Sequence, residues 1–230
     1  MRSCFRGGPW SEHHNKHVNP NMPLTLRRAV LTDAAALTDI YFSAFNLDAI
    51  SLRVFPRTSS SWNWWHDSVV AEIADPRAHF ICMYDSDSED QRVVAYAKWN
   101  APDALLETDL PAWPEGADGA LAKHFFGNLG EQHAKIMAGR RHWYLELVAT
   151  TPQYQGRGAA GQLLRWGIAQ SDEEGTATYL EASPDGKPIY EHLGFKEIGR
   201  LVVALEGTGE GVLAEKEFIE VFMVREIQNR

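Results

Sequence analysis

The chain has 230 residues, 44% of them hydrophobic and 23% charged, so it can fold around a core of its own. Its two cysteines exclude a disulfide framework, and no apolar run reaches the roughly 18 residues of a membrane-spanning helix. With 31 acidic against 22 basic side chains, the net charge of -9 argues against nucleic acid or an anionic membrane as the main partner. We expect a cytoplasmic protein without a secretory signal.

The beginning of the chain lacks any hydrophobic periodicity. Residues 1–23 are rich in Gly, Pro, Asn and His, which predicts a flexible tail. His13, His14 and His17 lie close together there, but no cysteine or carboxylate stands at a fixed spacing from them, so we expect no metal site. Residues 24–230 are expected to form a single domain.

The first patterned half predicts a strand, two helices and a hairpin. A strand is expected over 24–30, and Thr32 and Asp33 are expected to cap a helix. That helix has one apolar face, made of Leu37, Ile40, Tyr41, Ala44 and Phe45. A second helix is expected over 62–74. Strands 78–84 and 92–99 flank an acidic turn and predict an antiparallel hairpin.

The second half predicts alternating strands and helices. Residues 100–119 are rich in Pro, Asp and Glu, and such a long loop indicates a substrate lid or a solvated insertion. The segments that follow are a helix (118–137), a strand (142–149), a helix (158–170), a strand (176–182), a short helix ending at Leu193-Gly194, and strands 195–205 and 217–225. This order predicts a mixed α/β domain.

A glycine-rich loop joins strand 142–149 to the next helix. Gly156 and Gly158 let the backbone approach a ligand closely, and the N–H groups at a helix start attract phosphate oxygens. Arg157 and Arg165 add positive charge to an otherwise acidic chain. These features predict a pyrophosphate site on physical grounds.

Two kinds of pyrophosphate fit such a loop. Gly156-x-Gly158-x-x-Gly161 matches the dinucleotide fingerprint, and Glu181 ends the next strand, near the expected ribose position. However, Pro152–Gln155 separate the strand from the fingerprint, and too few residues follow Glu181 for a doubly wound sheet. A nicotinamide-dependent enzyme is therefore the less favoured interpretation.

A different spacing in the same loop carries a family resemblance. Gln155-x-x-Gly158-x-Ala160, after Pro152-x-Tyr154, resembles motif A of the GNAT superfamily of N-acetyltransferases. The segment IYEHLGF at 189–195 is similar to a second family segment. The resemblance implies the GNAT fold, a twisted and mostly antiparallel sheet flanked by helices that splays beside strand 142–149. The insertion at about 100–140 departs from minimal members and is expected to shape the acceptor pocket.

The resemblance also implies an activity and a cofactor. The chain would be an acyltransferase that moves the acetyl group of acetyl-CoA to a primary amine of a small acceptor, by direct attack in a ternary complex. The implied cofactor-binding residues are Val148, Ala149, Thr150, Gln155, Gly156, Arg157, Gly158, Ala159, Ala160 and Gly161. A non-catalytic acyl-CoA sensor of the same fold is the rival interpretation. No metal is expected, and a homodimer is compatible with the sequence.

Two residues are candidates for proton transfer. Tyr190 matches the family's general acid, and a phenol with a pKa of about 10 lies close to a thiol of about 8.5. Glu146 is the first choice for the base, with Glu181 or a water relay as alternatives. Strand alternation predicts one face with His142, Tyr144, Glu146 and Val148, and the other with Trp143, Leu145 and Leu147.

Aromatic clusters leave two interpretations open. Trp62, Trp64, Trp65 and His66 are typical of a helix core, or they form an aromatic wall for an amine. The same alternatives apply to the group His124, Phe125 and Phe126. The acidic runs 85–90 and 103–118 are expected to be solvated, and they could steer a cationic amine.

Overall fold

The structure is a computed structural model that describes residues 24–86, 91–102, 104, 110–206, 211 and 215–228. The predicted tail with its three histidines lies outside these ranges, as do parts of both acidic runs. Within the described ranges, no helix is both long and apolar enough to cross a membrane.

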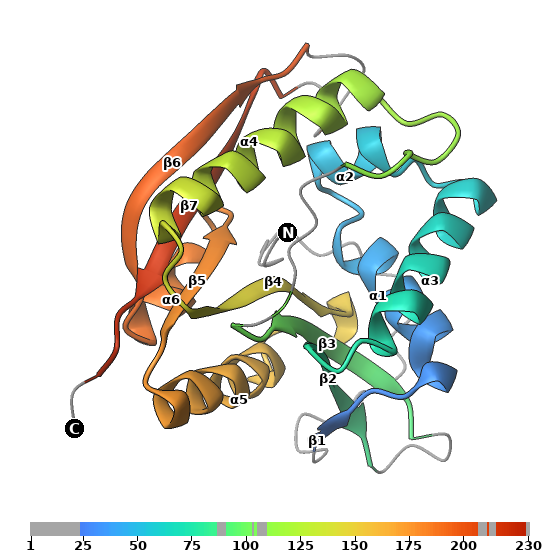
Figure 1. The fold of residues 1–230 in the computed structure, drawn as a ribbon. Coiled ribbons are helices and arrows are strands. Elements are labelled where there is room, and N and C mark those ends of the chain that lie inside the picture. Colours follow the sequence, from blue (N-terminus) through green and yellow to red (C-terminus); the bar gives the residue numbers. More distant parts are fainter. Residues whose placement is uncertain are drawn as a thin grey trace.

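The described residues form one seven-stranded sheet with helices on both faces (Figure 1). The strands are β1 (Leu24–Arg28), β2 (Ala78–Asp85), β3 (Val93–Asn100), β4 (His142–Thr150), β5 (Ala177–Ala182), β6 (Lys196–Ala204) and β7 (Glu217–Arg225). The helices are α1 (Ala34–Ala44), α2 (Ala49–Val54), α3 (Ser59–Ile73), α4 (Gly119–Met137), α5 (Ala159–Glu174) and α6 (Lys187–His192), with short 3-10 turns η1 (Leu31–Asp33) and η2 (Pro152–Tyr154).

The strand order is β1-β2-β3-β4-β5-β7-β6. Neighbouring strands run antiparallel except β4 and β5, which are parallel and are joined by α5 as a crossover. The expected mixed α/β fold with a mostly antiparallel sheet is therefore confirmed. A doubly wound parallel sheet, which the dinucleotide interpretation needs, is not what these residues form.

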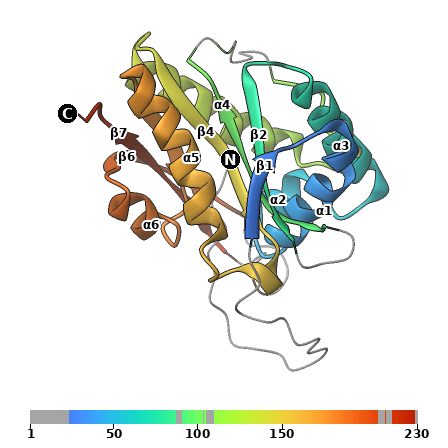
Figure 2. The same ribbon diagram turned by 90° about the horizontal axis from the view of Figure 1, so that it is seen from below.

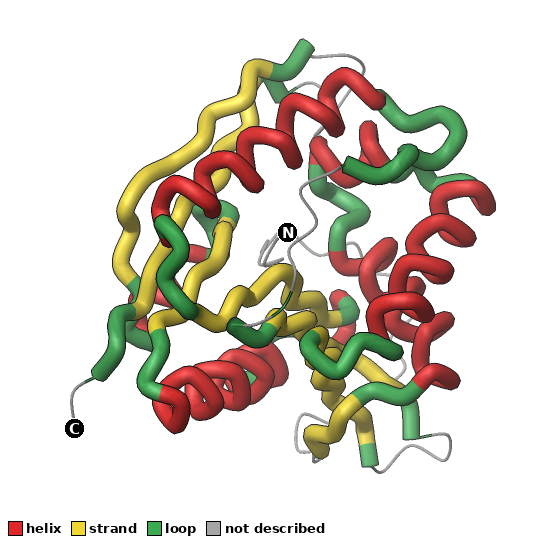
Figure 3. Tube along the Cα trace, in the orientation of Figure 1, coloured by secondary structure: helices red, strands yellow, loops and turns green. Residues whose placement is uncertain are grey.

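Each face of the sheet has its own apolar core. The first contains buried side chains of α1 to α4, including Tyr41, Phe55 and Trp65, and the second those of α5 and α6, including Leu163 and Tyr190. Figures 1 and 3 show α1, α3 and α4 on one side of the central strands and α5 on the other, and Figure 2 shows α5 along the strands from below. Residues on the two faces of the sheet are therefore packed independently and can form different parts of a site.

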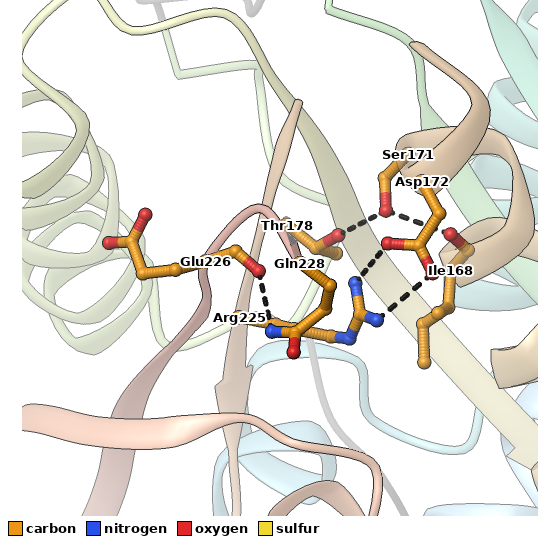
Figure 4. A network of polar contacts seen from close by, with 7 residues as sticks. All are labelled: Ile168, Ser171, Asp172, Thr178, Arg225, Glu226 and Gln228. Atoms are coloured by element: carbon orange, nitrogen blue, oxygen red, sulfur yellow. Dashed lines mark hydrogen bonds and ion pairs between the residues drawn. The ribbon is translucent and has the colours of Figure 1, made fainter. Parts of the chain in front are cut away.

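Helix α5 lies unusually close to the sheet. A Cβ atom added to Gly167 would stand 2.2 Å from the indole ring of Trp99 on β3, so only glycine permits this approach. The indole Nε1 also donates to the carbonyl of Leu163 at 3.3 Å. At the far end of the helix, Arg225 of β7 forms a two-pronged ion pair with Asp172, at 2.6 and 3.0 Å (Figure 4). These contacts fix α5 against the sheet at both points.

Near the first helix, one local prediction needs correction and one short helix was not predicted. Asp33 does not cap α1 with its side chain; instead its carboxylate accepts from the backbone N–H of Val30 and pairs with Arg27 at 2.6 Å. The short helix α2 was not predicted from the sequence. It begins where the Asp48 carboxylate accepts from the N–H of Ser51 at 2.7 Å, a cap with too few following residues to show a period.

A β-bulge in β4 overturns the predicted alternation. Lys98 of β3 pairs with Leu147, whereas the next residue, Trp99, pairs with Leu145, so Glu146 is an extra residue on β4. Leu147 consequently lies in the first core and Val148 in the second, the reverse of the predicted faces. His142, Tyr144 and Glu146 do share one side, because all three line the same cavity.

Candidate active site

The glycine loop presents an uncapped helix start. Gly156 and Gly158 have φ values of +75° and +78°, which favour glycine, and a Cβ at either position would meet nothing within 4 Å. Gly158 is the N-cap of α5 and supplies no side-chain hydrogen bond. By contrast, Thr58 caps α3 and Asp118 caps α4 through side-chain oxygens. The first N–H groups of α5 are therefore left to a ligand, and an anion suits them best.

Side chains around the loop hold its shape. The Gln155 side-chain amide donates to the carbonyl of Thr150 at 3.2 Å, which ties the loop to the end of β4. The guanidinium of Arg157 lies 4.8 Å from the centre of the Tyr154 ring, and the Tyr154 hydroxyl donates to Asp85 at 2.9 Å. A positive charge is thus positioned beside the helix start. Ala159, Ala160 and Gly161 are buried in the first turn of α5.

Strands β4 and β5 separate next to this loop. Their pairing covers His142 to Leu145 on β4 and ends at Leu145 and Leu180. Beyond that point Val148, Ala149 and Thr150 pair, among the described strands, only with β3. The predicted splay of the sheet is therefore present, and no other strand in the described part of the chain covers this edge of β4 just before the glycine loop.

A cavity of about 1370 Å³ lies on the other face of the sheet, between β3 to β5 and the helices α3 and α4. Carboxylates dominate the charged groups of its lining: Glu72, Asp75, Glu131, Glu146 and Glu181, against Lys98 and Lys123. Helix α4 belongs to the predicted insertion, so this segment does form one wall. The cavity suits a small cationic or neutral molecule better than an anion.

The buried Lys98 and the partly buried Glu146 form an ion pair in this cavity. The Lys98 ammonium lies 2.7 Å from Glu146 and 2.7 Å from Glu72 of α3, and Asn100 donates to Glu146 at 2.8 Å. Burial alone would raise the pKa of Glu146, but the charge and hydrogen bond of Lys98, together with the hydrogen bond from Asn100, hold that pKa below its usual value. Likewise the two carboxylates keep the pKa of Lys98 raised in spite of its burial. Glu146 is therefore a stable anion.

Glu181 is the second carboxyl of the cavity that comes from the sheet, and its surroundings differ. Its side chain is almost wholly buried and accepts a hydrogen bond from the Tyr144 hydroxyl at 2.9 Å. Burial raises the pKa of Glu181 to about 7, against the Tyr144 hydrogen bond, and the negative charge of Glu220 on β7 acts in the same direction as burial. This carboxyl can gain and lose a proton near neutral pH.

A pair of neutral histidines stands beside these groups. The Nε2 atoms of His133 and His142 are 2.6 Å apart, and Nδ1 of His142 is 2.6 Å from the carbonyl of Arg140. That carbonyl only accepts, so Nδ1 of His142 carries the proton and its Nε2 accepts from His133. Burial lowers the pKa of His133 to about 3 and also lowers that of His142. The pair therefore adds no positive charge to the cavity at neutral pH.

The aromatic candidates divide between core and cavity. Trp65 is buried and stacks on Tyr41 with ring centres 3.5 Å apart, although its edge reaches the cavity. Trp64 stacks on Trp113, and both line the cavity, whereas Trp62 is partly exposed and stacks on His66. In the second group, Phe125 is core, and Phe126 and His124 line the cavity.

Tyr190 lies on the face opposite the cavity. It is 1% exposed in α6 and belongs to the same apolar cluster as Val148 and Ala182, at the ends of the two separating strands. Phe195 packs edge-on against its ring, with centres 5.9 Å apart. Tyr190 and Glu146 thus lie on opposite sides of the place where β4 and β5 separate.

The sequence analysis missed several residues of this site: Glu72, Lys98, Asn100, His133 and the contact of Tyr144 with Glu181. One signal was present, since Lys98 is the one charged residue of the buried strand β3 and needs a partner for its charge. Nothing in the local pattern identifies that partner, because Glu72 and Glu146 lie far away in sequence.

Comparison with known proteins finds a family match over the part of the chain that contains the glycine loop. Residues 127–205, from within α4 to just past β6, match a family model described as an acetyltransferase (GNAT) domain. An acetyltransferase of Stachybotrys chartarum is 25% identical over 209 residues, which cover 84% of this chain and 89% of the relative. The glycine loop, β4 and α6 all lie within the matched range.

Solved structures share the fold over most of the chain. A polyamine N-acetyltransferase of Drosophila melanogaster matches with a TM-score of 0.62 at 12% identity, covering 89% of this chain and 100% of that one. A phosphinothricin acetyltransferase of Sinorhizobium meliloti, solved with AcCoA, matches with a TM-score of 0.54 at 17% identity, covering 89% and 88%.

Proposed function

Because residues 127–205 match a GNAT acetyltransferase domain and an acetyltransferase of Stachybotrys chartarum aligns over most of the chain, we propose that the protein is a GNAT acyltransferase that transfers the acetyl group of acetyl-CoA to a primary amine bound in the cavity beside β4. Two features that lie on opposite sides of the separating strands β4 and β5 support the proposal. One is the start of α5, which follows the glycine loop and has no side-chain cap, and the other is the acidic cavity. The first feature suits a diphosphate and the second an ammonium group.

Acetyl-CoA would bind along the edge of β4. Its diphosphate would accept hydrogen bonds from the N–H groups of Gln155–Gly161, with Arg157 adding charge. The main chain of Val148, Ala149 and Thr150, which has no β5 partner, would pair with the pantetheine arm as an added strand does. An N–H on this edge would polarise the thioester carbonyl. The solved relative with AcCoA supports the use of this cofactor.

Tyr190 and Glu146 are the proposed catalytic groups of this chain. Tyr190 is buried in the same apolar cluster as Val148, the first residue of the proposed pantetheine strand, and its hydroxyl would protonate the thiolate as it leaves. Glu146 faces the cavity from the bulge in β4 and carries a stable negative charge. It would stabilise the positive charge on the attacking nitrogen.

The cavity lining indicates which acceptors fit. Trp64, Trp113 and Phe126 offer apolar and π surfaces, and the carboxylates lie along the sheet and α3. A primary amine attached to a flat or apolar body therefore suits this cavity, because its ammonium can reach the carboxylates while its body packs on the rings. Acidic molecules would meet repulsion from the lining.

Amine turnover tests the proposal directly. The protein is incubated with acetyl-CoA and a panel of amines that includes aromatic amines, aliphatic polyamines and amino sugars, and both free thiol and the mass of each product are measured. We expect thiol release that depends on the amine, with aromatic primary amines among the best acceptors. Tight acetyl-CoA binding without turnover of any amine would favour the sensor interpretation instead.

A further inference from the structure

The two carboxyls of the sheet flank the point where β4 and β5 separate. Leu145 and Leu180 form the last pair between these strands, and Glu146 and Glu181 are the residues that follow on each strand. Both line the cavity. An acetyl group held at the splay would therefore have one carboxyl on each side.

Their partners give the two carboxyls different capacities. For Glu146, accepting a proton would break the 2.7 Å ion pair with Lys98 and leave the buried ammonium with Glu72 alone. Glu181 instead accepts from a phenol, Tyr144, which remains a partner whether the carboxyl is charged or neutral. Proton uptake is thus costly at Glu146 and cheap at Glu181.

The groups packed around Glu181 come from four elements. Tyr144 and Glu146 face it from β4, Tyr179 from β5 itself, and Glu220 from β7. From α4, His133 packs on Tyr144 and Tyr179 with ring centres 4.5 and 4.2 Å away, and it is neutral above about pH 3. Burial and the charge of Glu220 favour the protonated form of Glu181.

We propose that Glu181 is the base that removes the proton from the acceptor amine, while Glu146 remains ionised and holds the ammonium in place. This inference rests on the proposed function. The two carboxyls then have separate roles, which agree with their different partners: Lys98 for Glu146 and Tyr144 for Glu181.

The proton and electron balance is complete with the groups named. The ammonium of the acceptor gives one proton to the carboxylate of Glu181, and the freed lone pair forms the C–N bond at the thioester carbon. As the C–S bond breaks, sulfur takes its electron pair and a proton from the Tyr190 hydroxyl. The nitrogen then loses its second proton to the phenolate. One proton remains on Glu181 and is released to water before the next cycle.

The pH dependence of turnover tests the assignment. Because only the ionised form accepts a proton, kcat/KM of the wild-type enzyme should rise with pH and level off above an apparent pKa near 7. Glu181→Gln keeps the size and an acceptor for Tyr144 but cannot titrate. We expect it to lower kcat/KM by roughly 10²- to 10⁴-fold and to abolish the rise near pH 7, with unchanged acetyl-CoA affinity.

Two matched variants separate the alternatives. Glu146→Gln should raise KM for the amine and keep the rise near pH 7. Glu220→Gln removes a neighbouring negative charge outside the cavity, so it should move the rise to lower pH and leave the plateau rate unchanged. Persistence of the rise and the rate in Glu181→Gln, or loss of the rise in Glu146→Gln alone, would overturn the assignment.

A titration without substrate covers the case in which Glu181→Gln does not fold. In protein labelled with ¹³C at the glutamate carboxyls, NMR should show one carboxyl that titrates near pH 7 and moves to lower pH in Glu220→Gln. The absence of any glutamate titrating above about pH 6 would contradict the inference. A protein that shows this titration but acetylates no amine contradicts the proposed function, whereas an active enzyme whose pH profile is unchanged in Glu181→Gln contradicts only this inference.

Discussion

The glycine loop before α5 and the cavity beside β4 adjoin the same strand but are built by different means. The loop depends on main-chain geometry: two glycines with positive φ and a helix start without a side-chain cap. The cavity depends on side-chain charges that come from α3, β3, β4 and β5, above all Lys98 between Glu72 and Glu146. Main-chain groups of a short loop suit the diphosphate of the proposed cofactor, which is the same in every reaction. Side chains from distant elements suit the selection of one acceptor amine among many.

The largest expected effect concerns the charges of the cavity. Lys98→Met leaves the partly buried carboxylate of Glu146 without its cation, so we expect the free energy of unfolding to fall by up to about 3–5 kcal/mol in denaturant titrations. Glu72→Gln is the matched control, because that side chain is 41% exposed and its loss should cost less than about 1 kcal/mol. Similar losses in both variants would show that Lys98 has no special place in the cavity.

The next prediction addresses the loop alone. Gly158→Asn adds a side chain that tolerates positive φ, and its Cβ would meet no heavy atom within 4 Å, so the backbone conformation can be kept while a side chain is placed at the proposed diphosphate site. We expect acetyl-CoA affinity to drop by about 1000-fold, or about 4 kcal/mol, in calorimetric titrations. Gly175→Asn, at the other end of α5 with φ +63° and equal free space, should bind acetyl-CoA normally. Equal affinities in the two variants would remove the diphosphate from this loop.

The third prediction concerns the place where loop and cavity meet. Tyr190→Phe keeps the buried ring and removes the proposed acid, so kcat should fall by about 100-fold while acetyl-CoA affinity stays unchanged. Tyr41→Phe, which removes a buried hydroxyl bonded to Ser51 at 3.1 Å, should leave kcat as it is. Steady-state kinetics of both variants decide whether the effect is specific, and normal turnover in Tyr190→Phe would exclude the acid role.

The effect expected to be smallest at neutral pH comes from the histidine pair on the cavity wall. The pKa of His133 is about 3 in the folded state and about 6.5 when unfolded, so the unfolded chain binds more protons between these values. His133 should therefore remove up to about 1.4 kcal/mol of stability for each pH unit below 6.5. His133→Gln should flatten this slope in unfolding experiments at several pH values. The exposed His124→Gln on the same helix should keep the wild-type slope.

The contrast between loop and cavity also explains what could be predicted from the sequence. The hairpin of β2 and β3, helix α4 and the glycine loop depend on local periodicity and turn residues, and their predicted bounds agree with the structure to within one or two residues. The splay of β4 from β5 followed from the family resemblance. The ion pair and hydrogen bonds of the cavity did not follow from the sequence, since each depends on partners that are remote in sequence.

The bulge at Glu146 is the clearest example. Alternation along β4 predicts correctly that Tyr144 and Glu146 share a side, but it fails for Leu147 and Val148 because register depends on β3 as well. Similarly, the sequence of α3 does not show which of its tryptophans is buried. Trp65 is in the core because it stacks on Tyr41 of α1, whereas Trp64 stacks on Trp113 and lines the cavity.

The contact of Gly167 with Trp99 has a consequence for anyone who wishes to re-engineer acceptor preference. A single methyl group at position 167 would force either the Trp99 indole or α5 to shift, and a shift of α5 would also move the amides at its N-terminus. Libraries aimed at bulkier amines should therefore vary the α3 and α4 walls, which lie across the sheet, and keep this glycine–indole pair constant.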